Sequence, residues 1–504
     1  MADVRRMTDP DDLPPPGEPG VPAPREDPPP RGEIPPGPVM DTYLLEKAKA
    51  LQAGGHFEQA ERCYRQLLER DPKSVRALNN LGVLYETQKR MTEAEWAYRR
   101  AIEVNPTLAP AHYNLGHALQ VDGRLDQAEQ CYRRVLSLDP WSFAAHFNLG
   151  RLFEDQGRLG EAESHFRRAV EIVPESPAAH SCLGEALYRL GRFEDALASF
   201  ERSIAIEPLA ASEHFRAGKT LDALGRLADA AVAYRRSIEI EPNSPVANEN
   251  LVRALERLGR FGEAVQALAE WQSRAPEDPL AAHLFAALTG ADVPERASDD
   301  CVRETFDRFA SDYDATLERL GYRGPALIGI ALAKDGLEAA GALEVLDAGC
   351  GTGLCAEVLR PHALRLVGVD LSAAMLSYAR RRGAYDELVE RELVAYLDEH
   401  PDAFDLVAGG DTLIYFGALE PVLAAAARAL RPGGRLVFTL EQLPEGESVA
   451  HRIAPSGRYQ HSETYVRGAL QAGGLTPRLI LHAALRHEGG SPVPGLVVLA
   501  GAAE

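Results

Sequence analysis

The sequence lacks several features that mark particular classes of protein. Its six cysteines are scattered through 504 residues without a Cys-x-x-Cys pair. This spacing argues against a zinc site or a disulfide framework and for a reducing compartment. No run of about 18 apolar residues occurs, so no transmembrane helix or membrane association is expected. The N-terminus also lacks the apolar core of a secretion signal. We therefore expect a cytoplasmic protein without a metal site.

Positive charge is scarce as well. Lys and Arg number 54 against 75 Asp and Glu, which gives a net charge of −21 at pH 7. About half of this charge lies on each side of residue 296, and neither half contains a basic patch. Phosphate contacts require clustered Lys and Arg, so a nucleic-acid partner is not expected. A chain of this length needs two or more hydrophobic cores, which predicts a multidomain protein.

The N-terminal segment is dominated by proline. Residues 1–40 hold 13 prolines and few large apolar side chains. Such a segment cannot bury enough apolar surface to offset the entropy lost on ordering. We predict a disordered tail.

A single pattern repeats seven times along residues 41–278, with a period of about 34 residues. Each unit ends on a proline, which stops a helix by removing a backbone donor. In the unit that ends at Pro106, Gly82, Ala94 and the large side chain of Tyr98 precede that proline. The other units repeat these spacings, although only five carry the glycine. We expect the small residues to let two helices cross closely and the large residue to fill space toward the next unit. The prolines are Pro72, Pro106, Pro140, Pro174, Pro208, Pro242 and Pro276, and the glycines are Gly82, Gly116, Gly150, Gly184 and Gly218.

This pattern resembles the tetratricopeptide repeat. The resemblance implies an α-solenoid with a concave binding face, followed by a capping helix at 279–288 within a linker at 279–296. The "GKT" at 218–220 is not a phosphate loop, because Glu213 stands where that motif needs glycine.

Asparagine recurs on the first helix of several units, and it suggests a partner. A row of amides on the concave face offers donors and acceptors to an extended polypeptide backbone. Similar rows occur in tetratricopeptide proteins that feed protein substrates to a sugar-transfer domain. This resemblance favours a protein or peptide on the concave face; the alternative is that these are consensus surface residues. The row comprises Asn80, Asn114, Asn148 and Asn250, and Cys182 and Arg216 interrupt it.

From residue 297 to 504 strand and helix patterns alternate. "EVLDAG", "LRLVGVD", "FDLVAGG" and "RLVFTL" read as strands separated by helices. This alternation predicts a parallel sheet with crossover helices. "LILHAALRH" and "GLVVLAGA" read as two closing strands joined by a Gly/Pro-rich turn.

The stretch "VLDAGCGTG", residues 345–353, carries the chemistry. Its glycines alone fit a dinucleotide site, because Gly351, Gly353 and Ala356 match that fingerprint. Asp347 distinguishes a dinucleotide from a second ligand, S-adenosylmethionine (SAM). A carboxylate before the glycines would repel the pyrophosphate of a dinucleotide, whereas it suits the ammonium group of SAM. Asp370 ends the next strand after the glycines, where a carboxylate can accept both ribose hydroxyls.

These motifs, with the turn "RPGG" at 431–434, resemble class I SAM-dependent methyltransferases over most of the region from 297 to 504. The resemblance implies a Rossmann-like domain with a seven-stranded, mostly parallel sheet and SAM as cofactor. It places Glu392 and Leu393 near the adenine, where the family more often has Asp, and Asp411 near the methyl group. The remaining residues that match the cofactor motifs are Asp347, Gly349, Gly351, Gly353, Asp370 and Leu371.

The whole arrangement is similar to bacterial tetratricopeptide–methyltransferase fusion proteins. In that group the helix ahead of the domain covers the SAM site, which makes Phe309 and Tyr313 candidate lid residues; plain packing against the sheet is the alternative. Methyl transfer needs a base only if the acceptor must lose a proton. The candidates for that base are Asp411, His461, Tyr415 and His451.

Two of these candidates have simpler explanations. Asp411 could cap a helix, and His461 could be a surface histidine in a loop-like stretch. The fourth strand ends "GGDTLIY", without the Asn/Asp-Pro-Pro-aromatic motif of amine methylation or the Pro-Cys of cytosine methylation. We expect a SAM-dependent methyltransferase acting on an O or N acceptor. A scaffold with a non-catalytic SAM-binding domain and an enzyme with an oligomerising solenoid remain open.

Overall fold

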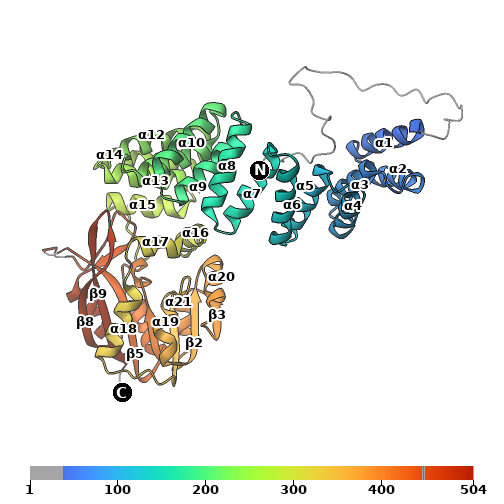
Figure 1. The fold of residues 1–504 in the computed structure, drawn as a ribbon. Coiled ribbons are helices and arrows are strands. Elements are labelled where there is room, and N and C mark those ends of the chain that lie inside the picture. The colour runs from blue at the N-terminus through green and yellow to red at the C-terminus, as the bar shows by residue number, and fades with distance from the viewer. Residues whose placement is uncertain (1–37, 445, 448, 503–504) are drawn as a thin grey trace. The chain divides into compact units, whose positions relative to one another are not determined.

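The computed structural model of the protein describes residues 38–444, 446–447 and 449–502. The tail expected at 1–40 lies outside these residues except for 38–40, which begin the first helix. The chain divides into two compact units, residues 1–240 and 241–504 (Figure 1). We describe each unit by itself.

The described part of the first unit consists of twelve helices that pack as six consecutive pairs. Each pair corresponds to one copy of the sequence repeat, and the pair-ending prolines lie just beyond the second helix. The helices are α1(Pro38–Ala53), α2(Phe57–Arg70), α3(Val75–Thr87), α4(Met91–Val104), α5(Ala109–Val121), α6(Leu125–Leu138), α7(Phe143–Asp155), α8(Leu159–Ile172), α9(Pro177–Arg189), α10(Phe193–Ile206), α11(Ala211–Ala223) and α12(Leu227–Ile240).

Glycine and an aromatic ring meet inside each of five pairs. A Cβ on Gly82 would lie 2.4 Å from the Tyr98 ring, and one on Gly150 would lie 2.6 Å from the Phe166 ring. The predicted close helix crossing is present. The ring, however, covers the glycine of its own pair, whereas we expected it to fill space toward the next unit. Gly218 of the "GKT" stretch packs on Tyr234 in the same way, 2.6 Å from that ring.

Successive pairs are also linked by ion pairs. Arg90 precedes α4 and contacts Glu61 of the previous pair at 2.9 Å. The same contact recurs one unit later between Arg124 and Glu95 at 2.8 Å. It recurs again as Arg158 with Glu129 at 2.9 Å and Arg192 with Glu163 at 3.4 Å. Partly exposed ion pairs of this kind contribute roughly 0–1 kcal/mol each.

The asparagines of the predicted row are mostly used inside the helical stack. Asn114 Nδ2 donates to Asn79 Oδ1 at 3.1 Å, and Asn148 Nδ2 donates to the Tyr113 hydroxyl at 2.7 Å. Asn80 is 2% exposed. Asn114 and Asn148 therefore join neighbouring repeats, whereas Asn250 donates to the Val246 carbonyl of its own helix at 2.8 Å. The buried Asn80, Asn114 and Asn148 do not form an open row.

The second unit begins with a seventh helix pair, α13(Pro245–Arg257) and α14(Phe261–Arg274). The helix expected at 279–288 is α15(Pro279–Thr289), whose N-cap Asp278 accepts from the backbone N–H groups of Leu280 and Ala281. Three helices lead into the sheet: α16(Asp299–Phe309), α17(Tyr313–Arg319) and α18(Gly324–Lys334).

The sheet of this unit has nine strands within the described residues. Five strands run parallel in the order β3-β2-β1-β4-β5, and β9 continues the sheet antiparallel to β5 and pairs with β8. This is the predicted mostly parallel sheet, closed by the predicted hairpin. Two short strands, β6 and β7, extend it from the end of β5. The strands are β1(Leu343–Ala348), β2(Ala363–Asp370), β3(Glu387–Glu390), β4(Phe404–Gly409), β5(Leu430–Gln442), β6(His451–Ile453), β7(Tyr459–His461), β8(Leu475–Glu488) and β9(Ser491–Ala502).

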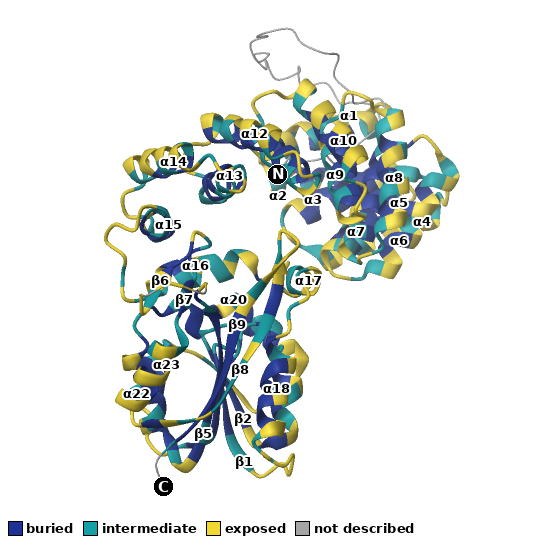
Figure 2. Ribbon diagram, turned by 90° about the vertical axis from the view of Figure 1, so that its left-hand side faces the viewer, coloured by how far each residue is buried: buried dark blue, intermediate teal, exposed yellow. Residues whose placement is uncertain are grey.

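Helices cover both faces of this sheet, with the buried strands between them (Figure 2). The helices α18 and α19 pack on one face around Leu332 and Leu359. The helices α21, α22 and α23 pack on the other around Leu397 and Leu423. The remaining elements are α19(Ala356–Leu359), η1(Arg360–His362), α20(Ala373–Arg382), α21(Leu393–Asp398), η2(Leu413–Tyr415), α22(Glu420–Ala429) and α23(Glu463–Ala472).

Candidate functional site

A cavity lies at the carboxyl ends of β1, β2 and β4. This is the edge where parallel α/β sheets bind ligands. Four segments supply its walls: the turn after β1, the end of β2, the segment before α21, and the loop after β4. A fifth segment, residues 296–313 ahead of the sheet, completes the wall. The polar and aromatic lining residues are Arg296, Asp299, Phe306, Tyr313, Asp370, Arg391, Glu392, Asp411, Thr412, Tyr415 and Phe416.

The glycine turn follows β1 directly. Gly349, Gly351 and Gly353 all have positive φ, at 68°, 55° and 90°. A side chain at Gly349 would meet Thr412 at 2.4 Å, so glycine is required there both by the backbone and by space. Gly349 and Gly351 line the cavity, whereas Gly353 does not.

Asp370 ends β2 beside this turn. Its Oδ2 accepts from the Gly351 N–H at 2.8 Å, and its Oδ1 accepts from the Ser372 N–H at 2.9 Å. Burial nevertheless raises the pKa of Asp370 above its usual value. Leu371 lies next to it in the cavity wall. The carboxylate is thus fixed by backbone donors at the mouth of the turn.

Asp347 lies in β1, two residues before the turn, and is 1% exposed. Its Oδ2 accepts from the Tyr385 hydroxyl at 2.6 Å, while its Oδ1 has no hydrogen-bond partner. Burial raises the pKa of Asp347 to about 7, against the opposing effect of the Tyr385 hydrogen bond. Asp347 is not among the residues that line the cavity. Asp347 is therefore a buried carboxyl group next to the glycine turn, with a hydrogen bond to one of its two oxygens.

Glu392 and Leu393 line the cavity on the side of α21. Glu392 caps that helix, because its Oε2 accepts from the Ala395 N–H at 2.7 Å. Its Oε1 accepts from Arg296 Nη1 at 2.8 Å, and Arg296 also forms an ion pair with Asp299 at 2.9 Å. Arg296 therefore ties the segment before α16 to the segment before α21.

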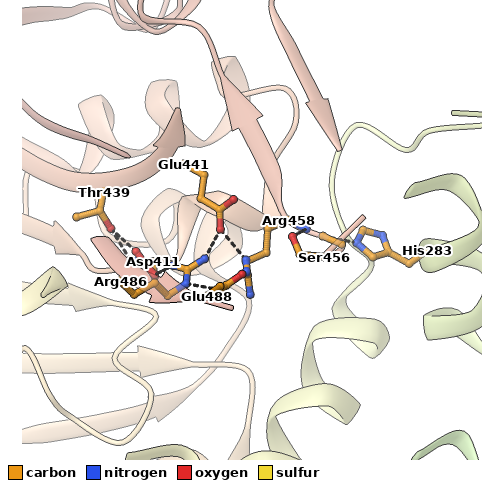
Figure 3. Close-up of polar contacts among 9 residues, drawn as sticks. His283, Asp411, Thr439, Glu441, Ser456, Arg458, Arg486 and Glu488 are labelled. Atoms are coloured by element: carbon orange, nitrogen blue, oxygen red, sulfur yellow. Dashed lines mark hydrogen bonds and ion pairs between the residues drawn. The ribbon is translucent and has the colours of Figure 1, made fainter. Parts of the chain in front are cut away.

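Asp411 follows β4 and has a left-handed backbone with φ of 55°, which is uncommon for a residue with a side chain. Thr439 forms hydrogen bonds with both the backbone and the side chain of Asp411: the Asp411 N–H donates to Thr439 Oγ1, and that hydroxyl donates to Asp411 Oδ1 at 2.7 Å. Arg486 Nη1 donates to Asp411 Oδ2 at 2.6 Å (Figure 3). Burial raises the pKa of Asp411, and the charge of Arg486 opposes that shift. Asp411 does not cap a helix. Its carboxylate is instead held by Thr439 and Arg486.

Arg486, on β8, is the centre of a buried charge network. Besides Asp411 it contacts Glu441 through Nη2 and Glu488 through Nε, the latter at 2.7 Å. Arg458 contacts the same two glutamates, at 2.6 and 2.5 Å (Figure 3). Two guanidinium groups thus face three carboxylates, and every carboxylate is paired.

The network reaches α15, the helix that follows the seventh repeat, through the turn that precedes β7. Gly457, next to Arg458, accepts a hydrogen bond from His283 of α15 at 2.7 Å. The segment after α15 is held to the cavity loop as well, since Glu295 O accepts from the N–H groups of Gly417 and Ala418.

Aromatic side chains close the wall opposite the glycine turn. Phe306 packs edge-on against Tyr313 at 5.9 Å and against Tyr415 at 5.6 Å between ring centroids. Tyr313 lines the cavity as the lid resemblance implies, whereas Phe309 is 43% exposed and does not. Within the described residues, the Tyr313 and Tyr415 hydroxyl groups have no hydrogen-bond partner.

His461 differs from the sequence interpretation. It lies in β7, not in a loop, and its imidazole is fully buried against Tyr465 with 5.9 Å between stacked rings. Its ring Nε2 bonds the carbonyl of Gly417 at 3.2 Å, and burial lowers its pKa to about 4. His461 and its neighbour His451 lie outside the cavity lining. His461 supports the loop that carries Tyr415.

The structure therefore brings together most of the residues singled out from the sequence and separates others from them. Arg296 and Arg486 were not singled out from the sequence. The signal for Arg486 was a charged residue inside the otherwise apolar strand pattern "LILHAALRH". The residues in the cavity wall are Tyr313, Gly349, Gly351, Asp370, Leu371, Glu392, Leu393 and Asp411; Asp347, Gly353 and His461 are outside it.

Residues 346–438 match the family model of the methyltransferase domain, which covers the glycine turn, Asp370 and Asp411. Residues 45–110, 113–177 and 182–245 match one tetratricopeptide-repeat model, and residues 223–288 match another. This chain joins tetratricopeptide repeats to a methyltransferase domain. Arg458 and Arg486 both lie beyond the matched part of that domain.

The curated relatives of this chain include methyltransferases. A malonyl-[acyl-carrier protein] O-methyltransferase of Pectobacterium atrosepticum is 31% identical over 146 residues, 29% of this chain and 55% of the relative. A trans-aconitate 2-methyltransferase of Paracidovorax citrulli is 36% identical over 114 residues, 22% of this chain and 43% of the relative. The chain spans about half the length of the curated relatives it matches.

Solved structures similar to this chain include tetratricopeptide proteins. The tetratricopeptide protein YrrB, described as having an unusual peptide-binding site, is 21% identical to this chain. The match covers 36% of this chain and 95% of that protein, with a TM-score of 0.35.

Proposed function

We propose that the methyltransferase domain uses SAM as its methyl donor. The observation that carries this proposal is the unpaired Oδ1 of Asp347, a buried carboxylate oxygen directly behind a glycine turn that lines the cavity. A buried carboxylate without a partner is unfavourable, and a cation at the turn would relieve it. SAM brings an ammonium group and no phosphate, whereas a dinucleotide brings a pyrophosphate that this carboxylate would repel.

The other residues fit the same ligand. Asp370 is fixed where it can accept from two ribose hydroxyls, with Leu371 beside it. Glu392 and Leu393 take the place near the adenine, and Tyr313 covers the site. Gly349 and Gly351 let the backbone approach the amino-acid part, and Gly353 completes the turn. SAM supplies a methyl group already activated on a sulfonium; the chain's part is to orient donor and acceptor and to exclude water.

We propose oxygen as the acceptor atom. The relatives named above include a malonyl-[acyl-carrier protein] O-methyltransferase and a trans-aconitate 2-methyltransferase. For the repeats we propose binding of a protein or peptide, which the solenoid delivers to the domain. The non-catalytic scaffold is the less favoured alternative, because the cavity keeps both Asp370 and the glycine turn.

Isothermal titration calorimetry of the full-length protein tests the donor. SAM is expected to bind, and NAD and NADP are expected to show no heat at concentrations where SAM saturates. Tight binding of either nicotinamide nucleotide, or no binding of SAM to folded protein, contradicts the proposal.

A further inference from the structure

The segment that joins α15 to α16, residues 290–298, is bound to the cavity wall; we call it the joining segment. Glu295 O accepts from the Gly417 N–H, and the Ala297 N–H donates to Tyr415 O, both at 2.8 Å. Arg296 and Ala297 line the cavity themselves. The backbone of the joining segment is thus fixed to the loop that carries Tyr415. The segment is part of the site and not a free tether between the repeats and the methyltransferase domain.

The side chain of Arg296 reaches a different wall of the cavity. Its Nη1 donates to Glu392 Oε1 at 2.8 Å, and its Nη2 forms an ion pair with Asp299 Oδ1 at 2.9 Å. The guanidinium group also lies over the Phe416 ring, 5.8 Å from the ring centroid. One side chain therefore joins the segment before α21 to the start of α16. Arginine suits this place because its planar fork of donors can pair with two carboxylates at once.

Glu392 uses its two oxygens for different partners. Oε2 accepts from the Ala395 N–H and caps α21, whereas Oε1 accepts from Arg296. The cap is local, but Arg296 is 96 residues away in the sequence. Without Arg296, the cap would be the remaining hydrogen bond to this carboxylate among the described residues. The second oxygen would then turn freely, because the last torsion of a glutamate has no sharp preference.

Stability alone is a weak reason for this arrangement. The side chain of Arg296 is 40% exposed and that of Glu392 17%, and ion pairs of such exposure contribute little to folding. Both residues line the cavity, so a bound ligand would exclude water from around them. Their attraction strengthens when water is excluded, because the local dielectric constant falls. The pair is therefore placed to act when the cavity is filled.

We infer that Arg296 is a positioning residue of the cofactor site, which acts on SAM through Glu392 and couples the joining segment to SAM binding. This inference rests on the proposed use of SAM. It adds a residue that matches no cofactor motif, since Arg296 precedes the matched part of the methyltransferase domain, residues 346–438. Coupling between two sites is reciprocal, so bound SAM should in turn hold the joining segment in place.

A double-mutant cycle on SAM affinity tests whether Arg296 acts through Glu392. Full-length native protein, Arg296→Met, Glu392→Gln and the double variant are each titrated with SAM by calorimetry. Arg296→Met should weaken binding about tenfold, the lower end for a hydrogen bond to a charged group, because the pair is partly exposed. In the Glu392→Gln background, where the cap can persist without the charge, the same change should cost less than about threefold.

The outcomes of the cycle are distinct. An unchanged affinity in Arg296→Met, or an equal loss in both backgrounds, overturns the inference. Failure of the folded native protein to bind SAM contradicts the proposed function itself. Arg319→Met is the matched control and should bind SAM like the native protein. Arg319 is exposed on α17, donates to Thr316 of its own helix at 2.9 Å and lies outside the cavity lining.

Hydrogen exchange followed by mass spectrometry tests the coupling to the joining segment independently. The amides of Gly417 and Ala297 are bonded between this segment and the cavity loop, so their exchange reports whether the segment stays in place. Saturating SAM should slow their exchange about fivefold or more in the native protein. Most of this protection should be lost in Arg296→Met, even when SAM saturates the variant. Equal protection in both proteins, or none in the native protein, overturns the inference.

Discussion

At the scale of single residues, the domain contains acids with contrasting environments. Asp411 is fully paired, whereas Asp347 has one oxygen without a partner and a pKa near 7. The difference is physical: the Arg486 guanidinium compensates the burial of Asp411, while only a tyrosine hydroxyl compensates that of Asp347. A buried acid that is half-protonated at neutral pH responds strongly to a neighbouring cation.

Asp347 should make SAM affinity depend on pH. The ammonium group favours the ionised carboxyl, so affinity should rise about tenfold between pH 6 and pH 8 as the group with pKa near 7 ionises. Because the folded pKa lies above the unfolded value, this group lowers the stability of the free protein as pH rises from about 4 to 7. Calorimetric titration of the protein with SAM between pH 6 and pH 8 measures the affinity.

Asp347→Asn is the matched variant, since its side chain can still bond Tyr385. Its SAM affinity should be about 10- to 150-fold lower at pH 8, the value of a charge-assisted hydrogen bond, and independent of pH. An Asn variant that binds SAM like the native protein would show that Asp347 does not face the ammonium.

Loss of Arg486 should lower the free energy of unfolding more than loss of an arginine near the surface. It is 3% exposed and contacts three carboxylates, so Arg486→Met leaves these carboxylates with Arg458 as their one guanidinium partner and Asp411 with none. Breaking a buried pair in this way costs about 3–5 kcal/mol. Arg478→Met, on the same strand but paired with Asp335 near the surface, should cost less than about 1 kcal/mol. Equal losses in urea unfolding of the two variants would contradict this account.

One local motif determines the position of several residues singled out from the sequence. Gly349, Gly351, Asp370 and Leu371 follow from a strand end and its turn, and they line the cavity; their contact with SAM stays a prediction. Prediction from the sequence failed for His461, which local composition suggested was in a loop. Its burial depends on pairing between β6 and β7 and on Gly417, and neither is visible in local sequence.

At the scale of elements, the repeat pattern specifies helix pairs because its small and large residues meet. The spacing within each repeat brings each glycine under the ring of its own pair. The strong alternation of apolar runs likewise predicted β1, β2, β4, β5 and the β8–β9 hairpin. β3 was not placed, because its four residues "ELVE" are short, acidic and partly exposed at the sheet edge. β6 and β7 have three residues each and form only through pairing.

Gly150→Ala should destabilise the repeats. The added Cβ would lie 2.6 Å from the Phe166 ring, and overpacking of this kind costs about 1–3 kcal/mol. Alanine recovers up to about 1 kcal/mol of helix propensity, so the net loss should be smaller than the gross one. Chemical unfolding followed by circular dichroism measures it.

Gly160→Ala on α8 is the control, since its Cβ would meet nothing within 4 Å. That variant should be neutral or more stable by up to about 1 kcal/mol. A Gly150 variant as stable as the Gly160 variant would show that the ring yields without loss.

At the scale of the whole molecule, the change of sequence pattern and the boundary between the compact units fall at different places. The repeat pattern continues to residue 278, while the first compact unit ends at residue 240. The seventh repeat therefore packs as part of the unit that holds the methyltransferase domain. Repeat spacing could not reveal this, because interactions such as that of His283 with Gly457 join residues 174 apart in sequence. No helix among the described residues is long and apolar enough to cross a membrane.

This division predicts how SAM acts on unfolding. Each compact unit should give its own transition in scanning calorimetry, and SAM should stabilise only the unit that contains its cavity, residues 241–504. At a hundredfold excess over Kd, binding contributes about 2.7 kcal/mol. For a unit of this size that raises one transition by about 5 °C and leaves the other unchanged. Asp347→Asn should reduce the shift at the same SAM concentration. If both transitions rise together in the native protein, the two units unfold as one, and the solenoid is coupled to the cofactor site through more than the seventh repeat.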